Sequence, residues 1–260
     1  MIKTAIVTGA YGAIGKAIAE GLARENYSVC LIGRDQEQLE SACRELSSKT
    51  RNKNLFFQVI DLSDHQQIRN FAGKWDRPLH LLVNNAATAP KSRTESTEGI
   101  EMQWAVNVLS YSRMIEAFVP FMQKTDRPRI VNVASYWAGG LDVDDPEFKE
   151  RRYDNDSAYR QAKQANRMMS AAYSAMLKEN GISVNACHPG DVNSKLSNAF
   201  GFGGHESPAE GAATPLYLAL SGELEGKSGG YYEHLKPVRC TFSLDPTGNL
   251  ALLRLCRSYS

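Results

Sequence analysis

The sequence predicts a single α/β domain in which a parallel β-sheet of about seven strands is doubly wound, with helices on both faces. Short apolar runs alternate regularly with amphipathic segments, which is the pattern of β-α-β units. The short runs are continuously apolar, as in strands that are covered on both faces. No repeat, low-complexity tract or linker interrupts the 260 residues, so we treat residues 1–260 as one domain.

The individual elements follow from these runs and from the segments between them. The expected strands are residues 4–8, 28–32, 55–60, 80–84, 129–134, 182–187 and 229–232. The expected helices lie near residues 14–25, 36–48, 64–74, 99–123, 157–180 and 208–221. Right-handed crossovers bring the carboxyl ends of parallel strands to one edge of the sheet, where ligands bind in such folds.

Composition and charge exclude several classes of protein. A net charge of +1 gives no basis for binding nucleic acid or an anionic membrane surface. The five cysteines include no C-x-x-C pair, which suggests reduced thiols. Neither a signal peptide nor an apolar run of about eighteen residues is visible, so we expect a cytoplasmic protein without a membrane span. Hydrolase and zinc-protease motifs are absent, and no metal site is expected.

A glycine-rich turn joins the first expected strand to the first expected helix. Its sequence is TGAYGAIG, which spaces Gly9, Gly12 and Gly15 three residues apart. Glycines let the chain turn tightly and approach a pyrophosphate, and the following helix offers free N–H groups and its positive dipole end. The strand before the turn and the helix after it favour a Rossmann-type dinucleotide site over a plain turn.

The end of the second strand bears on the choice between NADP(H) and NAD(H). In NAD-binding proteins of this type, an acidic residue about twenty positions after the glycines accepts hydrogen bonds from the ribose 2′-hydroxyl. Here Gly33 is followed by Arg34, which can bind a 2′-phosphate with its fork of donors. NADP(H) is therefore favoured. NAD(H) stays open because Asp35 either contacts the ribose or caps the next helix, and Lys16 either adds charge near the phosphates or faces solvent.

A tyrosine and a lysine stand four residues apart in an expected helix, so Tyr159 and Lys163 lie on one of its faces. An ammonium group near a phenol favours the phenolate and lowers the phenol pKa, which makes tyrosine a usable acid or base for a carbonyl or alcohol oxygen. Such a pair alone is common on helices. Its context is more specific, because Ser135 ends a strand and Asn107 lies in mid-helix, where asparagine is not favoured.

These motifs resemble the short-chain dehydrogenase/reductase family over nearly the whole chain. TGAYGAIG is similar to the family's T-G-x-x-x-G-x-G, with Ala13 in place of the middle glycine, and NNAA at 84–87 is similar to N-N-A-G. The resemblance implies that the tyrosine exchanges the proton, the serine orients the substrate oxygen, the lysine also holds the ribose and the asparagine supports a water relay. The family's catalytic set falls on Asn107, Ser135, Tyr159 and Lys163.

The same resemblance assigns a set of cofactor-binding positions. It places Asp61 at the adenine and Ser194 at the nicotinamide carboxamide. Asp61 alternatively caps a helix, and Asn84 alternatively serves in a turn. The full expected set is Gly9, Tyr11, Gly12, Ala13, Ile14, Gly15, Arg34, Asp61, Leu62, Asn84, Ala86, Tyr159, Lys163, Pro189, Gly190, Val192 and Ser194.

Two loops are expected beside the substrate. Residues 136–156 lengthen the gap between the expected catalytic serine and tyrosine to 24 positions, and their charged sequence predicts an exposed excursion. Residues 190–207 combine small residues with Phe200 and Phe202, which predicts either a mobile lid or an anchored loop. The long gap, together with HPGDVNSKL and SGGYYEHLKP, resembles the retinol dehydrogenase-like branch of the family.

The sequence therefore predicts an NADP(H)-dependent oxidoreductase that interconverts an aldehyde or ketone and an alcohol by hydride transfer. The expected partner is a small lipophilic carbonyl compound or alcohol, and the resemblance leaves a homodimer or a homotetramer open. Two rival hypotheses stay open as well. One is an NAD-linked alcohol dehydrogenase that uses Asp35, and the other is a cofactor-binding sensor or scaffold with little turnover.

Overall fold

One eight-stranded sheet runs through the structure, a computed structural model that describes residues 2–259. The strand order is β3-β2-β1-β4-β5-β6-β7-β8, and neighbouring strands are parallel except for β7 and β8. The strands are β1 (Thr4–Thr8), β2 (Ser28–Gly33), β3 (Leu55–Val59), β4 (Leu81–Asn84), β5 (Arg129–Val133), β6 (Ser183–Cys187), β7 (Tyr231–Glu233) and β8 (Lys236–Val238). All seven strands expected from the sequence are present.

The eighth strand, β8, was not expected from the sequence. It returns antiparallel to β7 through a two-residue turn, in which His234 and Leu235 have φ angles of 46° and 65°. Positive φ at both turn positions suits the twist of a hairpin, but this conformation is usually signalled by Asn-Gly or Asp-Gly. His-Leu carries no such signal, so the hairpin was invisible in the sequence.

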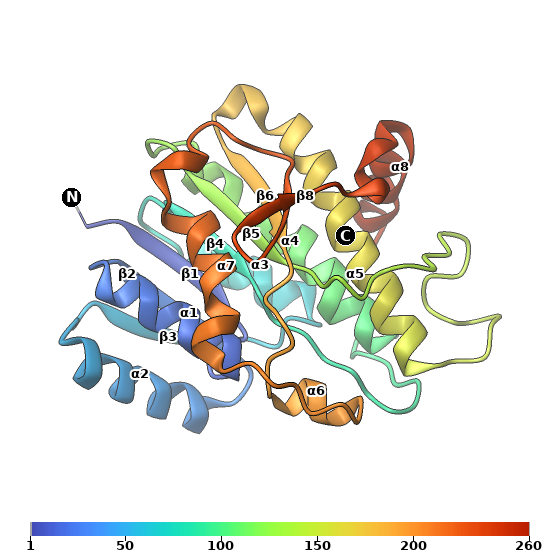
Figure 1. Cartoon of the computed structure of the whole chain (residues 1–260), viewed down its shortest axis with the longest axis horizontal. Coiled ribbons are helices and arrows are strands. Elements are labelled where there is room, and N and C mark those ends of the chain that lie inside the picture. Colours follow the sequence, from blue (N-terminus) through green and yellow to red (C-terminus); the bar gives the residue numbers. More distant parts are fainter. Residues whose placement is uncertain (1, 260) are drawn as a thin grey trace.

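Helices cover both faces of the sheet (Figure 1). Helices α1, α2 and α7 pack on one face and α3, α4, α5 and α8 on the other. The helices are α1 (Ala13–Arg24), α2 (Gln36–Thr50), α3 (His65–Gly73), α4 (Ser110–Met122), α5 (Asn155–Met176), α6 (Lys195–Ala199), α7 (Pro208–Leu220) and α8 (Pro246–Arg257). Successive strand residues enter opposite cores, as Ile6 and Val7 of β1 do. This explains the continuously apolar strand sequences.

The helical segments depart from the expected ones in three places. The segment expected as one helix over 99–123 is a π-helix, η1 (Trp104–Leu109), that continues into α4. Helix α6 has five residues, too few for a periodic pattern to identify it. Helix α8 begins at Pro246 after an Asp245 cap and packs on α5, in a stretch for which the sequence predicts no helix.

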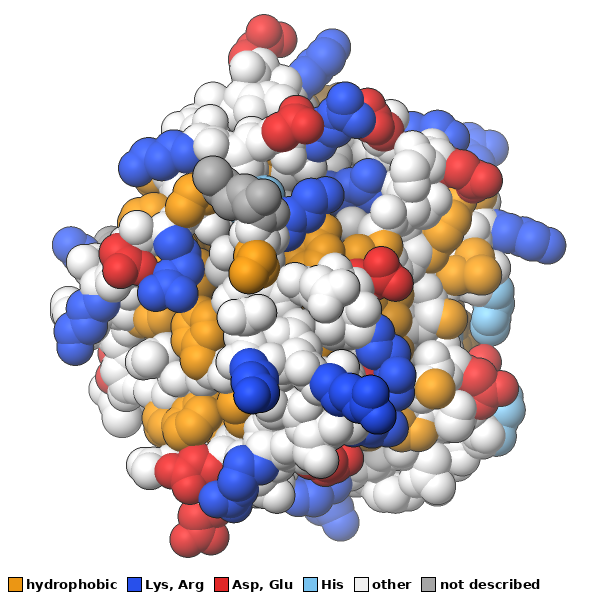
Figure 2. Space-filling view, turned by 90° about the vertical axis from the view of Figure 1, so that its left-hand side faces the viewer, with side chains coloured by type: hydrophobic (Ala, Val, Ile, Leu, Met, Phe, Trp, Pro, Cys, Tyr) orange, Lys and Arg blue, Asp and Glu red, His pale blue; other side chains and the backbone are white. Residues whose placement is uncertain are grey.

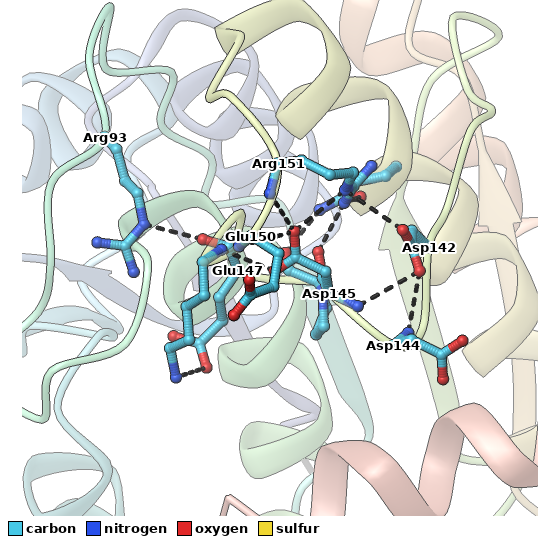
Figure 3. Close-up of polar contacts among 10 residues, drawn as sticks. Arg93, Asp142, Asp144, Asp145, Glu147, Glu150 and Arg151 are labelled. Atoms are coloured by element: carbon cyan, nitrogen blue, oxygen red, sulfur yellow. Dashed lines mark hydrogen bonds and ion pairs between the residues drawn. The ribbon is translucent and has the colours of Figure 1, made fainter.

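The excursion over residues 136–156 is anchored, not fully exposed as its sequence predicted. Residues 145–148 are buried. The Asp145 carboxylate accepts hydrogen bonds from the backbone N–H groups of Lys149 (2.7 Å) and Arg151 (2.9 Å). Figure 3 shows these polar contacts within the loop. The charge of Asp145 is satisfied within the loop itself, because a buried carboxylate is stable when backbone donors surround it.

Charge is mixed on the face that lies to the left in Figure 1. Figure 2 shows Lys and Arg side chains there scattered among acidic, neutral and hydrophobic ones. This face therefore offers no continuous basic surface of the kind that binds nucleic-acid phosphates. Within residues 2–259, no helix combines the length and the apolar character needed to cross a membrane.

Candidate active site

Two cavities lie side by side at the carboxyl ends of the strands, and Ile14, Ser194 and Leu196 line both. The glycine-turn cavity, of about 460 Å³, lies beyond β1 to β4, and the tyrosine cavity, of about 490 Å³, lies beyond β5 and β6. The expected cofactor residues in the first are Gly9, Tyr11, Gly12, Ala13, Ile14, Gly15, Arg34, Asp61, Leu62, Ala86 and Ser194. Those in the second are Ile14, Tyr159, Pro189, Gly190, Val192 and Ser194.

The glycine turn is tight for steric reasons. Gly9 has a φ of 64°, and its carbonyl oxygen accepts the N–H of Gly12 at 3.1 Å. A Cβ atom on Gly15 would lie 2.3 Å from that same oxygen, so the position excludes any side chain. Helix α1 begins at Ala13 without a side-chain cap, which leaves N–H groups at its start free for an anion. This cradle fits a pyrophosphate, and the Ala13 methyl does not close it, because Ala13 lines the cavity.

The acidic residue after β2 is engaged in capping α2. Asp35 accepts hydrogen bonds from the backbone N–H of Gln38 (3.0 Å) and from its side-chain amide (2.6 Å). Arg34 lines the glycine-turn cavity instead. Of the two roles considered for Asp35, the structure shows the helix cap.

Of the two readings of Lys16, the structure shows the solvent-facing one, and a different lysine lies at the glycine-turn cavity. Lys16 is paired with Glu45 at 2.8 Å on the surface, so it does not add charge to the glycine-turn cavity. Lys195 of α6 lines that cavity together with Arg34. Hydrogen bonds from Gln38 hold the pKa of Asp35 below its ordinary value, and the charge of Lys195 contributes to that shift. No signal in the sequence connects Lys195 with a position about 160 residues earlier, because the connection is made only by the fold.

Asp61 lines the glycine-turn cavity and does not cap a helix. One of its carboxylate oxygens accepts the backbone N–H (2.9 Å) and the hydroxyl (2.7 Å) of Ser63, which closes a local turn. The cap of α3 is Asp64, which accepts from the backbone N–H of Gln67 at 3.1 Å. The helix-cap alternative for Asp61 is therefore wrong.

Asn84 is misplaced in the expected cofactor set. It is fully buried, donates to the side chain of Asn132 at 2.9 Å, and lines neither cavity. The next residue, Asn85, lines the glycine-turn cavity and donates to the carbonyl oxygen of Thr8 at 2.8 Å. Strand residues alternate in direction, so a one-residue difference in where β4 ends decides which asparagine faces the ligand edge.

Tyr159 and Lys163 lie on one face of α5, with the lysine ammonium 5.4 Å from the centre of the tyrosine ring. The Lys163 Nζ donates to the carbonyl oxygen of Val133 at 2.9 Å, and the side chain is only 2% exposed. Tyr111 donates to the same carbonyl oxygen at 3.2 Å. Lys163 is thus held beneath the tyrosine and lines neither cavity, in contrast to the ribose contact expected for it.

The titration of this pair differs from the expected one. Burial raises the pKa of Tyr159, and the neighbouring Ser135 hydroxyl opposes the rise only in part. The nearby carboxylate of Asp191 adds to the rise. Burial also lowers the pKa of Lys163 to about 7. The pKa of Tyr159 is therefore raised, not lowered as the sequence suggested, because burial of the phenol dominates.

Ser135 is held on both sides of its Cα atom. Its hydroxyl accepts the backbone N–H of Trp137 at 3.0 Å. Its carbonyl oxygen accepts a hydrogen bond from Arg167, whose guanidinium stacks on the Tyr231 ring at 3.7 Å and donates to the hydroxyl of that ring at 2.6 Å. The conformation of the chain after β5 is therefore fixed, which presents the serine hydroxyl to the tyrosine cavity.

Asn107 lies in the π-helix η1, a form that often marks functional positions. Its side-chain oxygen accepts the backbone N–H of Thr88 (2.8 Å), and its amide donates to the Thr88 carbonyl oxygen (2.9 Å). Asn107 therefore ties the loop after β4, which lines the glycine-turn cavity, to the helix.

Aromatic side chains form the outer wall of the tyrosine cavity. Phe200 packs edge-on against Tyr159 (4.9 Å between ring centres) and Trp137 (5.5 Å), and Phe202 stacks parallel to Phe200 at 6.4 Å. The loop over 190–207 thus covers the candidate tyrosine. Sequence reasoning pointed to both phenylalanines but missed Trp137, whose place in the charged excursion hid its role.

The two residues at the end of β6 face opposite ways. Cys187 is buried in the core that contains α1, whereas His188 lines the tyrosine cavity. Burial lowers the pKa of His188 to about 3, so its ring is neutral near pH 7. The two do not form a nucleophile and base pair, in agreement with the alternation expected along a strand.

A doubly wound sheet with a glycine turn at its ligand edge, and a serine–tyrosine–lysine group beside it, defines an α/β dinucleotide-binding oxidoreductase. Residues 3–201 match the family described as short chain dehydrogenase. The chain belongs to this family of NAD(P)-binding oxidoreductases, in its retinol dehydrogenase-like branch.

Individual relatives support this placement. Retinol dehydrogenase 13 of Homo sapiens is 32% identical in an alignment 254 residues long, which covers 90% of this chain and 77% of the relative. Retinol dehydrogenase 11 of Mus musculus is 33% identical over 244 residues, with 88% and 77% covered. The crystal structure of an uncharacterized protein from Mycobacterium paratuberculosis has a TM-score of 0.84 and 25% identity, and covers 99% of this chain and 92% of its own.

Proposed function

We propose that this chain is an NADP(H)-dependent oxidoreductase that interconverts an aldehyde or ketone and an alcohol, with Tyr159 as the acid and base. One observation carries the proposal. The side chains of Tyr159 and Ser135 line the same cavity, and this cavity adjoins the glycine-turn cavity. A carbonyl compound in the tyrosine cavity would lie between the proton donor and the dinucleotide.

The glycine-turn cavity supports the choice of cofactor. The turn and the uncapped start of α1 suit a pyrophosphate. Arg34 and Lys195 bring two positive charges to the cavity, which suits a 2′-phosphate. Asp35, which an NAD-linked enzyme would use for the ribose, is already held by Gln38. These features favour NADP(H) over NAD(H).

The residues of the tyrosine cavity then have distinct tasks. When bound, NADPH would supply the hydride that reaches the carbonyl carbon. Tyr159 gives its hydroxyl proton to the carbonyl oxygen, so the alcohol forms and the tyrosine becomes a phenolate. Because burial raises its pKa, Tyr159 keeps its proton at neutral pH and is ready to donate it. Ser135 orients the same oxygen by a hydrogen bond and stabilises charge that develops on it.

Lys163 acts on the phenolate that proton donation leaves behind. Its Nζ lies 5.4 Å from the centre of the Tyr159 ring in a buried environment, where Coulomb attraction is stronger than in water. Since burial lowers the Lys163 pKa to about 7, a phenolate next to it shifts the equilibrium of the amine toward its protonated form. Lys163 therefore responds to the charge on Tyr159 and limits the cost of the phenolate.

The experiment is a panel of aldehydes, ketones and alcohols followed through NADPH absorbance, with Tyr159→Phe beside the natural chain. The variant should lose at least about a hundredfold in kcat, because it lacks the transferable proton, and should keep its affinity for NADPH. Tyr217→Phe, on the far helix α7, is the matched control and should keep full activity. Equal turnover by Tyr159→Phe contradicts the proposal. NADPH binding without turnover of any compound favours the sensor or scaffold hypothesis.

A further inference from the structure

The tyrosine cavity has an unbalanced charge. Among the described residues that line it, Asp191 is the one acidic or basic side chain apart from two histidines, His188 and His205. His188 is neutral near pH 7, because burial lowers its pKa to about 3. His205 lies at the exposed rim. The wall therefore carries one carboxylate and neither a lysine nor an arginine.

The carboxylate of Asp191 is positioned but not neutralised. The backbone carbonyl of Asp191 accepts the N–H groups of His205 (2.8 Å) and Glu206 (3.0 Å), which fixes its place in the loop after β6. Its side chain is partly buried, and the one side-chain contact is a long hydrogen bond from the Tyr136 hydroxyl at 3.5 Å. None of the ion pairs between residues 2–259 includes Asp191.

A second carboxylate strengthens the negative potential behind the wall. The side chain of Glu206 packs against Gly190, where a Cβ atom would lie only 1.7 Å from its Oε2. That oxygen is buried and has no hydrogen-bond partner. Burying an unpaired carboxylate oxygen is costly unless a positive charge lies close by. Within the described residues, no lysine or arginine of the cavity wall supplies that charge.

The rest of the cavity wall suits an organic cation. Tyr136 and Phe202 are 51% and 54% exposed, although large aromatic side chains are usually buried. Together with Trp137 and Phe200 they form an aromatic wall that faces the same cavity as Asp191. The faces of aromatic rings attract ammonium groups, and a carboxylate adds a charge-assisted hydrogen bond. A wall of aromatic rings with one carboxylate therefore suits a basic amine that is attached to an apolar skeleton.

We propose that the tyrosine cavity selects carbonyl or alcohol substrates that carry a basic amine on an aromatic or alicyclic skeleton. The ammonium group contacts Asp191 and the aromatic wall, while the carbonyl oxygen lies at Ser135 and Tyr159. Substrates with a carboxylate or phosphate at that position are rejected. The inference rests on the proposed function and names its substrate class.

Three matched aldehydes test the selection: 4-(dimethylaminomethyl)benzaldehyde, its neutral isostere 4-isobutylbenzaldehyde, and (4-formylphenyl)acetic acid. We expect kcat/KM for the amine to exceed that for the isostere by about tenfold or more at pH 7, and the acid to be the poorest of the three. In Asp191→Asn the ratio of amine to isostere should fall to near one. Asp144→Asn, an exposed position in the excursion, is the control and should keep the ratio.

Binding separates this inference from the proposed reaction. Competition of the three aldehydes with a dye bound in the cavity of Tyr159→Phe measures affinity where the proton donor is absent. Tighter binding of the amine without turnover in the natural chain supports the selection and contradicts the proposed reaction. Turnover of all three at equal kcat/KM, or a preference for the acid, overturns the selection and leaves the reaction standing. Equal binding of all three without turnover overturns both.

Discussion

The ammonium group of Lys163 donates a 2.9 Å hydrogen bond to the carbonyl oxygen of Val133, the last residue of β5. One helix residue is thereby tied to the strand that leads into Ser135. Lys163 is buried, so this bond holds its side chain in place while burial lowers its pKa and disfavours the charged form. The first prediction follows from that combination.

The stability of the protein should rise with pH just above neutrality, and Lys163 should be one cause. Its pKa is about 7 in the folded protein and about 10.4 in an unfolded chain, so between these values the unfolded chain holds more protons. The free energy of unfolding therefore rises with pH, by up to about 1.4 kcal/mol per pH unit for this group. Urea unfolding at pH 7.5 and about pH 8.5 measures the slope. Lys163→Met should show a smaller slope than the natural chain, and equal slopes refute the assignment.

His188 should make the protein sensitive to mild acid. Its pKa is lowered to about 3 by burial, against an ordinary value near 6.5. Between those values the unfolded chain binds the extra proton, so stability is lost as the pH falls below about 6.5. We expect His188→Asn to lose less stability between pH 7 and about pH 5 than the natural chain does in thermal unfolding. A difference of zero between the two pH profiles would show that the ring does not titrate as proposed.

Loss of the Asn107 side chain should disturb the loop after β4. Asn107→Ala leaves the backbone N–H and the carbonyl oxygen of Thr88 without their hydrogen-bond partners. The loss should cost about 1–3 kcal/mol of unfolding free energy. The same change should weaken NADPH binding, because Thr88 lines the glycine-turn cavity. Urea unfolding and cofactor titration check both effects. Asn70→Ala, on the exposed face of α3, should change neither.

The cations of the glycine-turn cavity should discriminate between the two nicotinamide cofactors. Arg34→Ala and Lys195→Ala should each weaken binding of 2′,5′-ADP by about tenfold, since each removes a charge near the 2′-phosphate. Binding of 5′-ADP should change little in either variant. Calorimetric titration compares the two nucleotides without any turnover. Lys16→Ala, whose lysine is paired with Glu45, is the control, and a loss equal to that of Arg34→Ala would contradict the assignment.

The buried carboxylate of Glu147 should hold the excursion to the body of the protein. It accepts hydrogen bonds from the backbone N–H of Glu101 and from the hydroxyl of Tyr259, both at 3.0 Å. Glu147→Ala should cost roughly 2–3 kcal/mol in urea unfolding and expose residues 136–156 to proteolysis. Glu150→Ala, nearby but exposed (Figure 3), should leave both unchanged.

The parts of the fold that the sequence could predict are those that repeat a local pattern. Continuous apolar strands and amphipathic helices determine the sheet and its two helical layers, and these were predicted. The β7–β8 hairpin could not be, because its turn residues, His234 and Leu235, adopt left-handed φ without glycine or asparagine. The short helix α6 could not be predicted, because five residues are too few to show the repeat of apolar residues that identifies a helix.

The candidate site shows the same division. Positions such as Gly9, Arg34 and Tyr159 could be predicted because each belongs to a short sequence motif whose residue types and spacing indicate a chemical role. Asn84 was misassigned because only the final register of β4 distinguishes it from Asn85. Lys195 and the direction of the pKa shift of Tyr159 depend on packing between segments distant in sequence, and on burial, which a motif does not contain.

The π-helix at Trp104–Leu109 also constrains the length of the chain at this point. Because such a turn closes over five residues instead of four, it stores one residue more than an α-helix needs. Deleting a single residue here would let the segment close as a regular α-helix, and the side chains within the π-turn, Asn107 among them, would then change direction relative to the loop they hold. Insertions and deletions would therefore be tolerated in the outer loops of this protein long before they were tolerated beside Asn107.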